Sequence, residues 1–136
     1  MDKKTLIEQI QSHLLDELRD IQRKLEEPHP EAGLGDRVHE IEALLTMYRF
    51  MPIRDYSDED VACPASLVEL ETQGTRAWYF IAPKGGGLVT SLDGKAVQVI
   101  TPNSPIGDAL LGKHVGDTID VQTRGALRRY QVVAIR

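Results

Sequence analysis

Two carboxylates, Asp36 and Glu40, lie four residues apart in a segment with helical periodicity. Residues four apart on a helix share one face, so the two side chains could form a single carboxylate site. A purely structural role is the alternative, because Asp36 can cap the helix and Glu40 can be a first-turn acid favoured by the helix dipole. The pair is a candidate site, and no catalytic residue is assigned to it.

A second candidate site is the start of a short helix predicted after Ser104. Ser104 can accept a hydrogen bond from the first helical turn, and Pro105 occupies a position where its missing N–H costs nothing. Gly112 can adopt the left-handed conformation that ends the helix. Thr101 and Asn103 precede the cap, and we expect both to remain available to a partner.

Other chemistry has less support in the sequence. The four histidines are scattered and lack paired ligand spacing, so we predict no metal site. Residues Gly85–Gly87 lack the Lys-Ser/Thr that follows in a phosphate-binding loop and are predicted as a plain turn. The single cysteine, Cys63, excludes an internal disulfide and is predicted to be a small buried side chain. We therefore expect no cofactor.

The composition, 27% charged and 41% hydrophobic residues, is that of a globular protein. No apolar run approaches the roughly 20 residues that span a bilayer, and the N-terminus lacks a signal-peptide core, so we expect a cytoplasmic protein. A net charge of −5 argues against a general nucleic-acid binder. Residues 1–60 hold 8 basic and 15 acidic side chains and residues 61–136 hold 8 and 6, which suggests two units with different surfaces.

The N-terminal part is predicted to be a helical hairpin. Apolar residues spaced three and four apart predict a helix over residues 3–27, with Ile7, Leu14 and Ile21 seven apart as in a coiled-coil seam. A second helix, from Asp36 to before Pro52, should pack antiparallel to the first. We assign residues 1–51 to this hairpin and residues 52–60 to an acidic linker.

Residues 61–136 are predicted to form an α+β domain, because the hydrophobic period changes to two after Ser66. Turn signals such as Asp93-Gly94 separate the strands, which we expect to form an antiparallel sheet with one short helix. In the run Trp78-Tyr79-Phe80, side chains alternate across the faces of a strand, so Trp78 and Phe80 should be core residues on one face. The expected strands are 67–71, 77–81, 88–92, 96–100, 118–123 and 126–135.

The run Ile100–Asp117 resembles the C-terminal signature of the Gre transcript cleavage factors of bacterial RNA polymerase. The matching positions are Ile100, Ser104, Pro105, Ala109, Leu110, Gly112, Lys113, Gly116 and Asp117. Thr101 replaces the usual serine and keeps the hydroxyl. The resemblance extends over Val61–Arg136 and implies an FKBP-like fold, and the preceding helical hairpin matches the family's order of elements.

In this family the coiled coil enters the secondary channel of the polymerase, and an acidic pair at its tip helps to hold a catalytic magnesium ion. Gly35-Asp36 matches the start of the tip motif, but His39 occupies the position of the second acid. The second helix limits the paired length to about 22 Å, shorter than in Gre factors. A short hairpin resembles instead the Rnk-type proteins, which bind polymerase without cleaving transcripts.

The resemblance implies a transcription regulator that binds bacterial RNA polymerase through Thr101, Asn103, Ser104 and Pro105. It would have no enzymatic activity of its own and would stimulate no cleavage, and any contact with nucleic acid would be indirect, within the complex. The oligomeric state is left open. One alternative is a genuine cleavage factor that uses the carboxylate pair with magnesium. Another is a peptidyl-prolyl isomerase, which the FKBP-like fold suggests but which requires an aromatic-lined pocket.

Overall fold

The computed structural model describes residues 1–136 and divides the chain into two compact units. The helical unit is Lys4–Met51, and the sheet unit is Pro52–Arg136 together with Met1–Lys3. The predicted linker, residues 52–60, therefore falls inside the sheet unit. None of the helices combines the length and apolar character that a membrane crossing requires.

Specific contacts explain why the linker and the first residues belong to the sheet unit. Asp58 Oδ1 accepts hydrogen bonds from the Ile135 N–H at 3.0 Å and from Arg136 Nη1 at 2.6 Å. The backbone N–H of Ile135 and the Arg136 guanidinium lower the pKa of Asp58. Lys3 is buried, donates to the Ala65 carbonyl at 2.9 Å and lies 4.4 Å from the centre of the Tyr56 ring.

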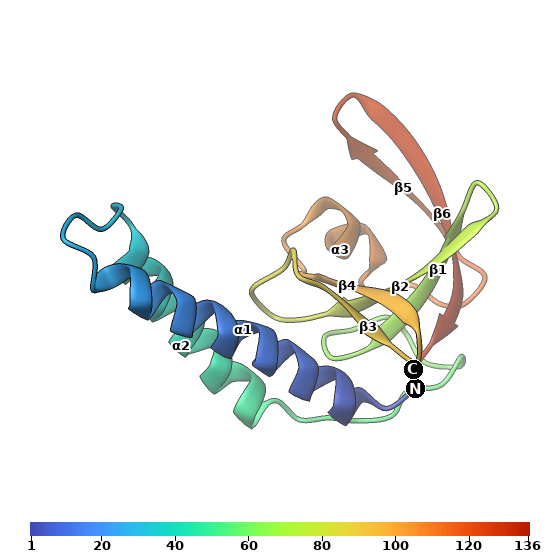
Figure 1. Cartoon of the computed structure of the whole chain (residues 1–136). Coiled ribbons are helices and arrows are strands. Elements are labelled where there is room, and N and C mark those ends of the chain that lie inside the picture. Colours follow the sequence, from blue (N-terminus) through green and yellow to red (C-terminus); the bar gives the residue numbers. More distant parts are fainter. The chain divides into compact units, whose positions relative to one another are not determined.

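The helical unit contains the two predicted helices, α1 (Lys3–Leu25) and α2 (Leu34–Phe50). They lie side by side and run in opposite directions (Figure 1). At about 1.5 Å per residue, α2 is about 26 Å long, close to the length expected from the sequence. The predicted seam of Ile7, Leu14 and Ile21 is buried, whereas Leu15 is 40% exposed, so the buried stripe is narrower than the apolar pattern suggested.

The start of α2 corrects one prediction. Gly33, not Asp36, is the N-cap; its φ is +87°, and its carbonyl accepts the first helical hydrogen bond from the Arg37 N–H at 3.1 Å. Glycine adopts this left-handed conformation at little cost, so α2 can begin before Asp36, the residue whose side chain was expected to cap it. Asp36 is therefore an exposed acid of the first turn, where the helix dipole favours negative charge.

The sheet unit carries six strands and a short helix, in the order expected from the sequence. The strands align as β3-β4-β2-β1-β6-β5. Their bounds are β1 (Leu67–Thr72), β2 (Thr75–Ile81), β3 (Val89–Leu92), β4 (Lys95–Ile100), β5 (Thr118–Thr123) and β6 (Ala126–Ile135), with α3 (Pro105–Leu110) between β4 and β5. The α+β class and the two-part organisation of helices and sheet are thus confirmed.

The sheet is mixed, which corrects the predicted antiparallel arrangement at one strand pair. β2 and β4 are parallel, with Trp78 opposite Val97 and Ile81 opposite Ile100, whereas the other four pairs are antiparallel. The chain passes from β2 to the edge strand β3 and turns back, which places β4 beside β2. The alternation of apolar and polar residues indicates which face of a strand is buried. It does not indicate which strand will pair with it when the connection is longer.

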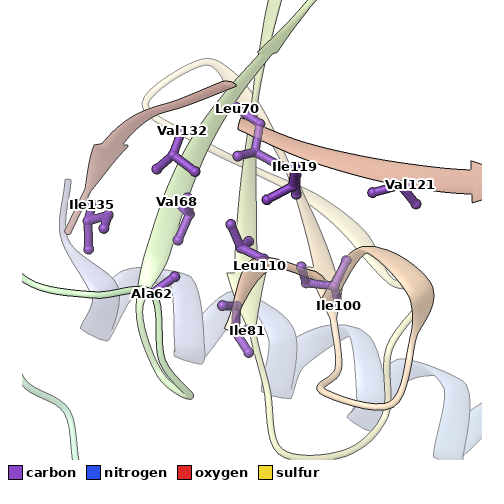
Figure 2. Close-up of a cluster of buried hydrophobic side chains, with 10 residues drawn as sticks. All are labelled: Ala62, Val68, Leu70, Ile81, Ile100, Leu110, Ile119, Val121, Val132 and Ile135. Atoms are coloured by element: carbon purple, nitrogen blue, oxygen red, sulfur yellow. The ribbon is translucent and has the colours of Figure 1, made fainter. Parts of the chain in front are cut away.

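The core of the sheet unit lies where α3 meets one face of the sheet. Figure 2 shows Leu110 of α3 among Val68, Ile81 and Ile100, in a cluster that strands β5 and β6 extend. Leu110 is fully buried, and burying such a side chain stabilises the fold by about 1.5–3 kcal/mol. Trp78 and Phe80 are also buried, as predicted. Cys63 is only half-buried, which corrects the prediction of a buried thiol.

Candidate functional site

The segment from the end of β4 into the first turn of α3, residues 101–106, is called the Ser104 turn and is held by the side chain of Ser104. Ser104 Oγ accepts from the Gly107 N–H at 3.1 Å and donates to the Thr101 carbonyl at 2.7 Å. The Thr101 carbonyl also accepts from the Ser104 N–H at 3.1 Å. Ser104 is thus the N-cap of α3 with Pro105 in its first turn, as the sequence predicted.

Gly107 allows α3 to approach the turn more closely than any other residue could. A Cβ atom built on Gly107 would lie 1.9 Å from the Thr101 oxygen and 2.9 Å from Ser104 Oγ. Real Cβ atoms do not approach other heavy atoms this closely. The position of α3 against the turn therefore requires glycine, which has no side chain, at position 107.

The four predicted partner-binding residues divide into two buried or half-buried residues and two exposed ones. Thr101 is buried, and its hydroxyl donates to Asn103 Oδ1 at 2.6 Å. This corrects the expectation that Thr101 is available to a partner, since its hydroxyl is used inside the turn. Asn103 and Pro105 are exposed, whereas Ser104 is half-buried. Only Asn103 and Pro105 present their side chains to solvent.

Residues after α3 fasten its C-terminal end to the sheet unit. Gly112, with a φ of +79°, donates its N–H to the Ala62 carbonyl at 2.8 Å, and the Lys113 carbonyl accepts from the Ala62 N–H at 2.8 Å. Asp117 Oδ2 accepts from the His114 N–H at 2.8 Å, and the Gly116 N–H donates to β6. The stretch from Ser104 to Asp117 therefore forms a rigid support for the turn.

At the tip of the helical hairpin, the carboxylate of Glu40 is already paired. Arg37 Nη1 donates to Glu40 Oε2 at 3.1 Å, and the same guanidinium makes two hydrogen bonds to Glu17 of α1, at 2.7 and 2.9 Å. Asp36 and Glu40 are both exposed and lie on α2, but Glu40 is paired with Arg37, which it shares with Glu17. The arrangement stabilises the hairpin. Of the candidate pair, only the carboxylate of Asp36 is not bound by a cationic side chain.

The Arg37–Glu17 pair predicts a pH-dependent stability of the helical unit. Hydrogen bonding to Arg37 lowers the pKa of Glu17 below its ordinary value of 4.5. The stabilisation is therefore complete above pH 4.5 and is lost as the pH falls through the lowered pKa. Both side chains are about two-fifths exposed, so we expect Glu17→Gln to cost only about 0.5 kcal/mol at neutral pH.

Urea unfolding followed by the helical signal measures this effect at pH 7 and at about pH 3. The cost of Glu17→Gln should shrink at the lower pH. Glu42→Gln is the matched control, an exposed acid on α2 that should leave stability unchanged at both values. A cost of Glu17→Gln that is equal at the two pH values would exclude this role of the pair.

The two alternative functions would require a metal site or an aromatic-lined pocket. No group of three or more His, Cys, Asp or Glu side chains is placed to hold a metal ion. A hollow beside the turn is lined in part by Gly86, Gly87 and Ile106, and no aromatic side chain lines it. The aromatic-lined pocket that an isomerase requires is not formed there.

Two residues that shape these sites were not singled out in the sequence. Gly107 could have been found, because glycine inside a helix is unfavourable and signals a close approach of backbones. Arg37 follows Asp36 directly, but its contact with Glu17 joins residues 20 apart in sequence. That contact depends on how the two helices align, which a local pattern does not report.

Comparisons with known proteins place the clearest similarity in the sheet unit. The family model for "Transcription elongation factor, GreA/GreB, C-term" matches residues 88–136. Transcription elongation factor GreA of Thermotoga maritima is 27% identical over 103 residues, which are 75% of this chain and 62% of that protein. GreA of Cereibacter sphaeroides is 28% identical over 101 residues, 74% of this chain and 60% of that protein. The chain thus covers about three-fifths of these relatives.

Among solved structures, GreA factor homolog 1 (Gfh1) of Thermus thermophilus is 26% identical to this chain. The alignment covers 98% of this chain and 91% of that one, with a TM-score of 0.45.

Proposed function

We propose that this chain, which belongs to the Gre-type superfamily of transcription elongation factors, binds bacterial RNA polymerase through its sheet unit near the secondary channel. The observation that carries the proposal is the turn at Ser104, which lies inside the segment matched by the family model. In this turn, part-buried hydrogen bonds of Thr101 and Ser104 hold the conformation while Asn103 and Pro105 are exposed to solvent. A rigid turn loses little conformational entropy on binding, which favours a specific docking contact.

The second part of the proposal is that binding modulates transcription without stimulating transcript cleavage. The alternative, a genuine cleavage factor, requires carboxylates at the hairpin tip that are available to a magnesium ion held by the polymerase. In this chain His39 occupies the position of the second tip acid, and Arg37 pairs with Glu40. A hard divalent cation prefers several oxygen ligands, and only Asp36 of the candidate pair is without a bound cationic side chain.

The experiment that tests the binding step titrates labelled full-length chain with core RNA polymerase and measures a dissociation constant. Saturable binding that a cleavage factor of the Gre family displaces supports a shared docking surface. Absence of binding, under conditions in which that factor binds, would overturn the proposal.

We expect the chain to leave the rate of transcript cleavage in backtracked complexes within about twofold of the factor-free rate, because the Glu40 carboxylate at the tip is already hydrogen-bonded to Arg37. When a Gre cleavage factor is present, added chain should lower the rate, because the two compete for the polymerase. The measurement is the shortening of labelled RNA in the presence of magnesium. Robust cleavage that disappears in Asp36→Ala would instead establish the alternative.

A further inference from the structure

The face of the sheet opposite the core cluster of Figure 2 carries a second hollow. Val68 belongs to that cluster, and because neighbouring residues of a strand point to opposite faces, Glu69 lies on the other side. The hollow has a volume of about 310 Å³ and is lined by residues of the sheet unit alone. These residues are Glu69, Arg76, Ala77, Trp78, Lys95 and Ala96.

Trp78 brings an unpaired hydrogen-bond donor to this hollow. The residue is only 7% exposed, and its indole Nε1 is buried without a hydrogen-bond partner. An indole N–H donates and cannot accept, so only an acceptor such as a carboxylate oxygen satisfies it. A buried donor without a partner is unfavourable. A ligand that supplies an acceptor here therefore gains a hydrogen bond that the free protein lacks.

Charged residues of opposite sign lie on either side of Trp78. Glu69 is opposite Trp78 across β1 and β2. Lys95 is on β4, two residues before Val97, which pairs with Trp78 across β2 and β4. Arg76 is two residues before Trp78, so the same register places the two cations next to each other on one face. Neighbouring like charges repel, which favours an anionic group beside them.

Two of these charges have no counter-ion. Arg76 pairs with Glu71, with 3.0 Å between Nε and Oε2. Neither Lys95 nor Glu69 takes part in any ion pair of the chain. The hollow therefore offers a free ammonium group and a buried N–H donor to an anionic group, and beside them a half-buried carboxylate to a cationic one.

We propose that this hollow binds a free α-amino acid with an apolar side chain, in its zwitterionic form. The α-carboxylate accepts from the Trp78 indole N–H and from Lys95, and the α-ammonium group donates to Glu69. Lys95 is exposed and has no partner, so its side chain can move to admit the ligand to Nε1. Glu69 would repel a simple anion and Lys95 a simple cation, whereas a zwitterion satisfies both.

The small side chains of Ala77 and Ala96 complete the lining and leave room for the apolar side chain of the ligand. L-Leucine is therefore the probe, and two analogues each lack one of its charges. 4-Methylpentanoate has no ammonium group, and 3-methylbutylamine has no carboxylate.

The test titrates the full-length chain with L-leucine and measures the heat of binding and the fluorescence of Trp78, the single tryptophan of the chain. We expect saturable binding that changes the fluorescence. Each analogue should bind at least about tenfold more weakly than leucine, because one charged hydrogen-bonded contact is lost. Leucine that produces neither heat nor a fluorescence change overturns the proposal. Binding of 4-methylpentanoate as tight as that of leucine overturns it too, because the hollow would then recognise an anion only.

Two variants assign the charged contacts. Glu69→Gln should weaken leucine binding about tenfold or more and strengthen binding of 4-methylpentanoate, because the repelling charge is removed. Lys95→Gln should weaken the binding of both compounds. The matched controls are Lys84→Gln and Glu59→Gln, exposed residues of the same unit that lie outside the hollow. Controls that weaken leucine binding as much as the two variants do would overturn the proposal.

Trp78→Phe tests the buried donor, because it keeps an aromatic ring and removes the N–H. Thermal unfolding shows whether each variant folds, and calorimetry measures leucine binding to this one. Weaker binding of leucine supports the proposed contact, and unchanged affinity would overturn it. If Trp78→Phe does not fold, the opposite effects of Glu69→Gln on leucine and on 4-methylpentanoate decide the matter.

Discussion

Replacing Gly107 with alanine should destabilise the sheet unit by about 3 kcal/mol or more, because the new methyl group would overlap the turn. The Cβ atom would lie 1.9 Å from the Thr101 oxygen and 2.7 Å from its carbonyl carbon, and both are backbone atoms. Backbone cannot rotate away as a flexible side chain does. Either α3 leaves its position over the core or the hydrogen bonds of Ser104 break. Urea denaturation monitored by Trp78 fluorescence measures the loss.

Gly35→Ala provides the control for this substitution. Gly35 also lies in a helix, but no atom lies within 4 Å of the position of its Cβ. Because alanine is a better helix former than glycine, Gly35→Ala should stabilise the helical unit by about 0.5–1 kcal/mol. The same chemical change is thus expected to have opposite signs in the two helices. If Gly107→Ala unfolds at the same urea concentration as the wild type, the close approach of α3 to the Thr101 carbonyl is wrong.

Replacing Asn103 with aspartate should weaken binding to core polymerase about tenfold while leaving the fold unchanged. The substitution keeps Oδ1, which accepts from the Thr101 hydroxyl at 2.6 Å, so the internal hydrogen bond of the turn survives. It removes the two amide donors and adds a negative charge that docking would desolvate. Because Asn103 is exposed, the free energy of unfolding should change by less than about 0.5 kcal/mol.

Asn103→Ala is a less informative variant for the same question. It removes the acceptor of the Thr101 hydroxyl, which is buried, and an unpaired buried hydroxyl costs about 1–3 kcal/mol. Gln122→Glu adds the same charge at an exposed position of β5 and controls for a general electrostatic effect. Polymerase titrations of the aspartate variant and this control decide the matter. Equal affinities of Asn103→Asp and wild type would place the docking surface elsewhere.

The bounds of most elements could be predicted from local patterns. The period of two located the strands of the sheet unit, and Ser104-Pro105 located the start of α3, because capping and alternation act between residues close in sequence. The seam of Ile7, Leu14 and Ile21 is buried for the same reason, since helical spacing alone places them on one face. The candidate docking residues at the Ser104 turn, by contrast, rest on the resemblance to the Gre factors and stay a prediction.

The remaining features depend on contacts between distant parts of the chain, and only the tertiary structure decided them. The parallel pairing of β2 with β4 follows from the return of the chain at the sheet edge. Arg37 reaches Glu17 because the two helices align in one register. Thr101 is buried because α3 and the loop of residues 85–87 pack against it. Hydrophobic periodicity and capping residues indicate where a helix or strand begins and which of its faces is buried. Which other element packs against that face depends on the packing of the whole unit.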